Sequence, residues 1–308
     1  MQTSCTAGLA MANPDVFAST APVMAASLCP SFLFEACVDS LFSALQAQQG
    51  GAGRLELCSN LLEGGMTPSY GLIKAVKEQV QIPVHVLIRP RAGDFCYTDL
   101  EIKVMQEDIE AVGRLGVEGV VLGILNIEGH IHTQRVHMVF LLIFTGFLLM
   151  KEMAVRCERL GLSLTFHRAF DCTADAIQAL ETLIDLQIPR VLTSGQHETV
   201  IEGIQVLQEL VELAKGRISI LPGGGITESN AAKVVSILGV GELHGTARSL
   251  VKSGMSFTNT RIADSMGMSS NRMATDAVKV RKIINACMQA LSGQSHIHLH
   301  NYDNILNS

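Results

Sequence analysis

The chain has 308 residues, of which 48% are apolar, and its formal net charge is −6 at neutral pH. This length suffices for one full α/β barrel core or for two smaller domains. The acidic balance and the absence of tryptophan argue against nucleic acid as a partner, and eight scattered cysteines without a CxxC pair exclude a secreted disulfide scaffold. We therefore expect reduced thiols in a cytoplasmic protein.

The first 30 residues differ from the rest in composition. Residues 1–30 are rich in alanine, serine and threonine, and no basic residue precedes Arg54. The segment therefore lacks the positive charge of a secretory signal or a transit peptide. We expect a disordered extension over residues 1–30, one domain over residues 31–291 and a flexible tail over residues 292–308.

From residue 32 onward, short apolar runs rich in β-branched residues alternate with segments of helical periodicity. The apolar runs predict strands at 32–38, 54–58, 84–89, 118–122, 162–167, 190–194, 218–222 and 241–245. The periodic segments predict helices near 41–50, 67–80, 98–112, 174–186, 199–214, 227–238 and 274–291. Eight strand–helix units in a chain of this length predict an α/β fold, a single-domain (β/α)8 TIM barrel. An open, doubly wound sheet is the alternative, although it would normally show a glycine-rich turn after the first strand.

One segment breaks this alternation. Residues 136–150 are almost continuously apolar, and we interpret residues 139–149 as an insertion. A membrane span needs about 20 apolar residues. We therefore expect no stable membrane insertion, and favour an insertion packed on the barrel, or an aberrant segment, over a membrane contact.

Polar residues gather at the predicted carboxyl ends of the strands, where the active site of a (β/α)8 barrel lies. A charged residue inside an apolar run needs a partner when it is buried, so their convergence favours a shared polar site. These residues are Glu35, Cys37, Asp39, Glu56, Cys58, Arg89, His167, Arg168, Asp171, Ser194, Gly223, Gly224, Gly225 and His244.

Two Glu-x-Cys sequences, Glu35 to Cys37 and Glu56 to Cys58, lie near the ends of the first two strands. Side chains alternate along a strand, so each glutamate shares a face with its cysteine. If the two strands are neighbours, about 4.8 Å apart, both thiols face one space. Two thiolates with no histidine nearby in sequence favour Cu(I) over tetrahedral zinc. Packed core cysteines and a reactive thiol beside acid–base groups remain open alternatives.

A second hypothesis is an enzyme acting on a small phosphorylated or carboxylated metabolite. His167 would be its general acid or base, with Arg89 and Arg168 as anion clamps. The glycine-rich turn at residues 223–225 precedes a predicted helix, where backbone N–H groups could hold the anion. A tight strand-to-helix turn with Thr227 as the N-cap explains the same pattern equally well.

Five motifs occur in a characteristic order. They are Phe-Glu-Ala-Cys-Val-Asp-Ser, Gly-Arg-Leu-Glu-Leu-Cys-Ser, Ile-Arg-Pro-Arg-Ala-Gly-Asp, Thr-Phe-His-Arg-Ala-Phe-Asp and Leu-Pro-Gly-Gly-Gly-Ile-Thr. In these motifs, over about residues 32–286, the chain strongly resembles the CutC copper-homeostasis family, and its animal-type members most of all. The apolar residues 139–149 and the tail after about residue 288 depart from the family pattern.

The resemblance to this family implies a function as well as a fold. It implies a TIM-barrel protein that binds Cu(I), found in the cytoplasm and also in the nucleus. It further implies a homo-oligomer, a tetramer, and copper ligands at Cys37 and Cys58. The resemblance thus favours copper binding over the packed-cysteine alternative, while the additional His, Arg and glycine-turn residues keep the enzyme hypothesis open.

Overall fold

The computed structural model describes residues 32–132, 149–257, 259 and 271–306. Within them, one parallel sheet contains β1 (Leu33–Val38), β2 (Arg54–Leu57), β3 (Val84–Leu87), β4 (Gly119–Leu122), β5 (Ser163–Phe166), β6 (Arg190–Thr193), β7 (Ser219–Pro222) and β8 (Glu242–Gly245). The strand order β7-β6-β5-β4-β3-β2-β1-β8 places the first and last strands side by side. A parallel bridge between Gly223 and His244 joins β7 to β8. The predicted TIM barrel is confirmed, and the open-sheet alternative is wrong.

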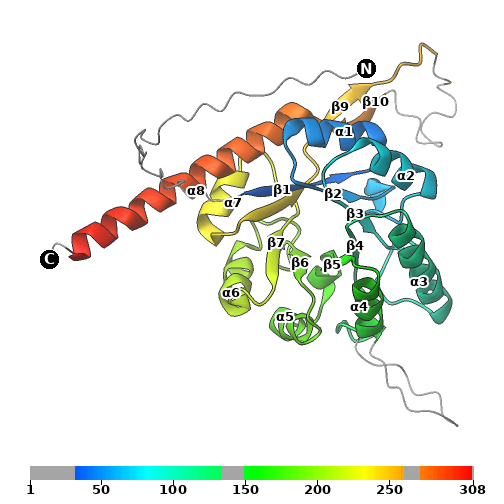
Figure 1. The fold of residues 1–308 in the computed structure, drawn as a ribbon, viewed down its shortest axis with the longest axis horizontal. Helices are drawn as coiled ribbons and strands as arrows, with labels where there is room; N and C mark the ends of the chain where they lie inside the picture. Colours follow the sequence, from blue (N-terminus) through cyan, green and yellow to red (C-terminus); the bar gives the residue numbers. More distant parts are fainter. Residues whose placement is uncertain (1–31, 133–148, 258, 260–270, 307–308) are drawn as a thin grey trace, which may run out of the picture.

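Helices surround this sheet (Figure 1). They are α1 (Leu41–Gly50), α2 (Tyr70–Gln79), α3 (Asp99–Arg114), α4 (Leu149–Arg159), α5 (Ala176–Asp185), α6 (Ile204–Ala214), α7 (Ala231–Leu238) and α8 (Ala277–Leu306). Local sequence signals explain several helix starts. Thr98 and Glu101 form a capping box at the start of α3, in which each side chain accepts the backbone N–H of the other residue.

Several helix boundaries differ from the sequence prediction. The helix α2 begins at Tyr70 and not at residue 67, because the Ser69 hydroxyl caps it by accepting the N–H of Leu72. The helix α6 begins at Ile204 and not at residue 199. Residues 227–230 form a turn before α7, in which the Asn230 side chain accepts the N–H of Thr227. The helix α8 continues to Leu306, beyond the predicted end at residue 291. Whether residues 292–308 are flexible stays a prediction.

The sequence analysis missed the helix α4 and an antiparallel hairpin of β9 (Arg248–Lys252) and β10 (Asn271–Thr275). The two strands lie beside α1, at the edge of the barrel (Figure 1). Each has five residues, and their pairing joins segments about twenty residues apart. Such non-local pairing leaves only a weak signal in a local hydrophobic pattern.

The apolar segment at residues 136–150 lies outside the described residues, apart from Leu149 and Met150 at the start of α4. The predicted insertion at residues 139–149 therefore stays a prediction. In the part of the chain that the structure describes, no helix combines the length and apolar character needed to cross a membrane.

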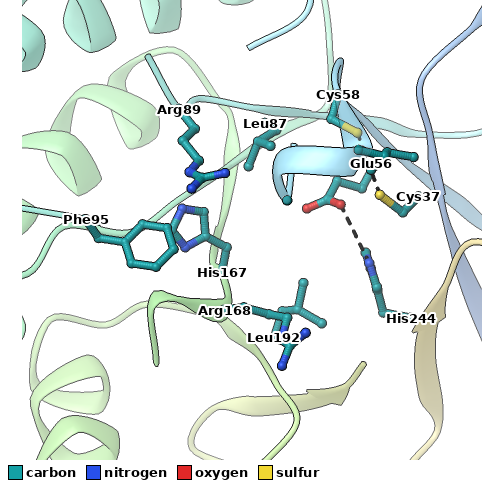
Figure 2. A pocket seen from close by; sticks show the side chains of 12 residues that line it. Cys37, Glu56, Cys58, Leu87, Arg89, Phe95, His167, Arg168, Leu192 and His244 are labelled. Carbon is teal, nitrogen blue, oxygen red and sulfur yellow. Dashed lines mark hydrogen bonds and ion pairs between the residues drawn. The ribbon is translucent and has the colours of Figure 1, made fainter. Parts of the chain in front are cut away.

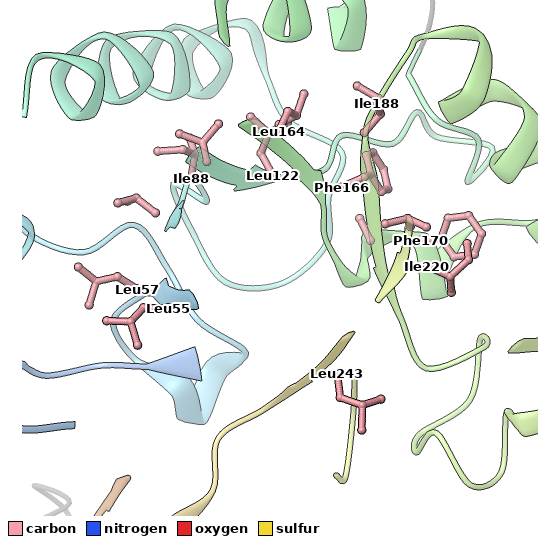
Figure 3. Packing of buried hydrophobic residues seen from close by; sticks show 14 of the residues in the cluster. Leu55, Leu57, Ile88, Leu122, Leu164, Phe166, Phe170, Ile188, Ile220 and Leu243 are labelled. Atoms are coloured by element: carbon pink, nitrogen blue, oxygen red, sulfur yellow. The ribbon is translucent and has the colours of Figure 1, made fainter. Parts of the chain in front are cut away.

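The main hydrophobic core lies between the barrel strands and the helices. Leu55 and Leu57 of β2, and Leu122 of β4, are fully buried in it, together with Phe166 of β5 (Figure 3). These residues alternate along their strands with residues that face the barrel axis. These apolar side chains thus lie on the outer face of the sheet, against the helices, and the inner face carries polar groups.

A layer of paired charges fills the barrel interior below the carboxyl ends of the strands. Arg54 forms ion pairs with Glu35 and with Glu242, the second at 2.8 Å. Arg190 forms an ion pair with Glu242 at 2.9 Å. We call Glu35, Arg54, Arg190 and Glu242 the interior ion network. Two positive and two negative groups balance in it, which reduces the cost of burying each of them.

Candidate metal centre

The two predicted cysteines come together above the interior ion network. β1 and β2 pair with Cys37 opposite Glu56, and Cys58 follows directly after β2. The sulfur atoms of Cys37 and Cys58 are 3.8 Å apart, and both cysteines are buried and free. As strand alternation predicts, the two thiols face one space. Their separation is too long for a disulfide bond, which measures about 2.05 Å.

A histidine from the last strand completes this cluster. His244 lies on β8, beside β1, and its Nε2 atom is 3.6 Å from Glu56 Oε2. One potential ligand atom each from Cys37, Glu56 and His244 lies within 4.8 Å of the others, and all three residues are buried. Figure 2 shows the three side chains turned toward one another. The sequence showed no histidine near the thiols, but barrel closure supplies one.

The charges around His244 determine its protonation state. Burial opposes a charged imidazole, but the nearby Glu56 and Glu35 carboxylates and the contact with Cys37 raise the pKa of His244 well above its ordinary value. Burial raises the pKa of Glu56, against the attraction of His244. The hydrogen bond with Cys58, and then burial, raise the pKa of the Cys37 thiol. The cluster without metal therefore contains an imidazolium beside a protonated thiol.

A cavity of about 110 Å³ opens beside this cluster. Besides the cluster residues and Cys58, it is lined by the predicted site residues Arg89, His167 and Arg168. Leu61, Leu87, Phe95 and Leu192 contribute apolar wall. The structure thus brings seven of the predicted site residues to one cavity, namely Cys37, Glu56, Cys58, Arg89, His167, Arg168 and His244.

His167 lies at the end of β5, and its hydrogen bonding defines its tautomer. Its Nδ1 atom accepts the N–H of Ala169 at 3.0 Å, so the proton of the neutral ring is on Nε2. Burial and the charge of Arg89 lower the pKa of His167 to about 3. At neutral pH the ring is therefore an uncharged hydrogen-bond donor. This state fits hydrogen bonding to a ligand better than the general acid–base role that the enzyme hypothesis assigns to it.

Glu35 and Asp39 lie away from this cavity. Glu35 is fully buried one level lower, where it accepts from His244 Nδ1 at 2.7 Å and pairs with Arg54. It supports His244 from below and does not line the rim. Asp39 is half-buried, 4.0 Å from Arg248 Nη1, between the end of β1 and the hairpin.

Asp171 and Ser194 form a separate loop network with Arg168. The Asp171 carboxylate accepts from the Arg168 guanidinium at 2.7 Å and from the Ser194 N–H at 3.0 Å. Arg168 also donates to the Ser194 hydroxyl at 2.7 Å. The network joins the loops that follow β5 and β6 and thereby holds Arg168 at the cavity mouth.

The glycine-rich turn at residues 223–225 does not line the cavity. The N–H of Gly223 donates to Thr193 O, and a Cβ atom at this position would lie 2.5 Å from Leu192. The first turn of α7 begins only at Ala231. Close packing therefore explains the glycine at position 223. The structure gives no support to the predicted anion site at a helix N-terminus.

Sequence reasoning missed the interior ion network apart from Glu35. Arg54 precedes Glu56 by two residues, and Glu242 precedes His244 by two. The strand alternation that placed Glu56 and His244 inside the barrel also places Arg54 and Glu242 there. That signal was present in the sequence, but these residues lie near the starts of their strands, away from the end where the site was expected.

Comparison with known proteins identifies the relatives of this chain. The model of the CutC family matches residues 32–249. A human protein named copper homeostasis protein cutC homolog is 46% identical over 255 residues, which cover 82% of this chain and 88% of the human protein. A family protein CutC of Bacteroides fragilis (strain YCH46) is 44% identical over 234 residues, 76% of this chain and 87% of that protein. The crystal structure of CutC from Streptococcus agalactiae superposes with a TM-score of 0.62 at 36% identity, covering 70% of this chain and 98% of that one.

Proposed function

The chain belongs to the CutC family, and we propose that it acts in copper homeostasis by binding Cu(I) between the thiolates of Cys37 and Cys58. The names of the human and mouse relatives support copper homeostasis as the general role. The proposal places this activity inside the cell, in the cytoplasm and also the nucleus, and in a homo-oligomer.

The 3.8 Å separation of the two sulfur atoms carries the copper proposal. Two metal–sulfur bonds of about 2.3 Å, the length known for zinc, span such a distance. Thiolates are soft donors that select Cu(I). Binding would release the thiol protons, because only thiolates ligate metal. The imidazolium of His244 would then offset the single negative charge that two thiolates and one Cu(I) leave on the loaded site.

Packing alone is the competing explanation for the two cysteines. Cys37 and Cys58 form a small buried cluster with Leu87 and Val121, as apolar residues do. Packing does not account for Glu56 and His244, which are buried, polar and next to Cys37. Ion pairing among Glu56, His244 and Glu35 offsets the cost of burying these groups. The gathering of ligand-type atoms from Cys37, Glu56 and His244 within 4.8 Å, beside a second thiol, favours a metal site over a purely structural contact.

Replacing both cysteines by serine should abolish tight Cu(I) binding. We expect the Cys37→Ser/Cys58→Ser variant to bind at least about 100-fold more weakly, since loss of outer-shell partners alone costs 10–100-fold. Anaerobic competition for Cu(I) against a chromophoric chelator measures the change. Circular dichroism verifies that the variant is folded.

The matched control is Cys157→Ser/Cys287→Ser, which changes two buried cysteines of α4 and α8 far from the cavity in sequence. This control should bind Cu(I) like the wild type. Unchanged stoichiometry and affinity in the Cys37→Ser/Cys58→Ser variant would refute the shared thiolate site.

A further inference from the structure

The cavity wall that Arg89 forms carries a buried positive charge without a carboxylate partner. Arg89 is 5% exposed. Its Nη1 atom donates to the carbonyl oxygens of Glu63 and Gly65 at 2.8 and 2.7 Å, and its Nη2 atom donates to Gly93 O at 2.9 Å. All three acceptors are neutral carbonyls. Within the described residues no carboxylate forms an ion pair with Arg89, and its Nε atom has no hydrogen-bond partner.

His167 presents a second unused donor to the same cavity. The ring is 5% exposed, and its Nε2 atom has no hydrogen-bond partner. Because Nδ1 already accepts the Ala169 N–H, Nε2 carries the proton and is a donor. Figure 2 shows the His167 ring beside the Arg89 guanidinium, on the opposite side of the view from the cluster of Cys37, Glu56 and His244.

Arg89 and His167 line one cavity, and each has a buried N–H group without a hydrogen-bond partner. An unsatisfied buried donor is costly, and more so when it is charged. An oxyanion satisfies both donors and also neutralises the guanidinium. Arg168 and His244 also line the cavity, but they pair with Asp171 and Glu35. The Arg89 charge is the one left unmatched among these three, so a monoanion suffices and a dianionic phosphate would bring excess negative charge near Glu56.

The remaining walls set the size and character of the ligand. The Phe95 ring lies 5.1 Å from the Arg89 guanidinium carbon and 4.9 Å from the His167 ring. Leu61, Leu87 and Leu192 contribute further apolar wall to the same cavity. A ligand that fills about 110 Å³ must be small, and these walls favour a short apolar body attached to the charged group.

We propose that this cavity binds a small monocarboxylate, with Arg89 supplying the charge and His167 Nε2–H the directing hydrogen bond. The site is distinct from the thiol pair although both open into one cavity. Carboxylate binding at this site needs no copper, so this proposal can be correct even if the copper proposal is wrong.

Titration calorimetry with copper-free, full-length protein tests this proposal. Propionate and inorganic phosphate are titrated separately at pH 7 in a chloride-free buffer. The informative variant is His167→Asn, whose shorter side chain retains an oxygen to accept the Ala169 N–H but withdraws the donor from the cavity. We expect propionate to bind the wild type and to bind the variant about tenfold more weakly or worse, the loss typical of a hydrogen bond to a charged group.

Two control variants separate this site from its neighbours. Arg217→Gln, which removes an exposed positive charge that pairs with Glu181 and does not line the cavity, should leave propionate affinity within about twofold, because a screened surface charge contributes little. The Cys37→Ser/Cys58→Ser variant should also bind propionate like the wild type, regardless of how its affinity for Cu(I) changes. Thermal unfolding confirms that each variant is folded.

Several results would overturn the proposal. They are absent propionate binding in the wild type, equal affinity in His167→Asn, an equal loss of affinity in Arg217→Gln, or a preference for phosphate. Failure of the copper proposal would show in the competition experiment and would leave the propionate result unchanged.

Discussion

Replacing Arg54 by methionine is expected to lower the free energy of unfolding by about 3–5 kcal/mol, the usual cost of breaking a buried ion pair. Arg54 is 5% exposed and is shared between Glu35 and Glu242. Methionine has a similar length but no charge, so Glu35 would keep only His244 as a charged neighbour and Glu242 only Arg190. Urea unfolding at pH 7 measures the change.

A surface ion pair provides the matched control for Arg54. Arg217 pairs with Glu181 at 2.7 Å, but both side chains are more than 40% exposed. Arg217→Met should change stability little, because water already screens this pair. If the two variants lost equal amounts of unfolding free energy, burial could not be the reason why the interior ion network stabilises the protein. The Arg54→Met/Glu35→Gln double variant should recover part of the lost stability, because it removes a buried carboxylate that Arg54→Met leaves without its arginine partner.

Acidification from pH 6.5 to pH 4 is expected to destabilise the protein through two buried, neutral histidines. Burial, with the charges of Arg54 and Arg190, outweighs the attraction of Glu35 and lowers the pKa of His85 to about 4. Burial and Arg89 lower the pKa of His167 to about 3. In this pH window the unfolded chain binds a proton at each histidine and the folded chain does not. Stability therefore falls as pH falls, by about 1.4 kcal/mol per pH unit for each histidine.

The His85→Gln variant isolates one of these two contributions. Between pH 6.5 and pH 4 its stability should fall by about 3 kcal/mol less than that of the wild type. His130→Gln, at an exposed position between β4 and α4, is the control and should follow the wild-type profile. Urea unfolding at several pH values gives the slopes. Parallel slopes for His85→Gln and the wild type would show that His85 does not cause the acid sensitivity.

Glu35 contributes to acid sensitivity at lower pH. Burial raises its pKa, but the hydrogen bond from His244 and the charge of Arg54 outweigh burial and bring the pKa below its ordinary value of 4.5. A carboxylate with a lowered folded pKa stabilises the protein above its unfolded pKa, and that contribution is lost as the pH falls toward the folded pKa. This loss begins near the lower end of the histidine window and should not mask the difference between His85→Gln and the wild type.

The strand pattern and the shared face of each Glu-x-Cys motif could be predicted from the sequence, because both follow from the local two-residue period of a strand. The eight predicted barrel strands match the observed ones to within two residues at each end. The meeting of Cys37 and Cys58 followed once β1 and β2 were neighbours, which holds for successive strands of a barrel. The hairpin of β9 and β10 escaped prediction, because its pairing partners are distant in sequence and its strands are short.

The composition of the site was decided by tertiary structure. Closure of the barrel brings β8 beside β1, so His244 joins Cys37 and Glu56 although about two hundred residues separate them in sequence. The same register places Glu35 below His244 as its support. The unused donors of Arg89 and His167 became visible only when the partners of their other atoms were known. By itself the sequence determined which residues face inward, because that depends on local periodicity; the three-dimensional closure decided which of them meet and which hydrogen bonds remain open to a ligand.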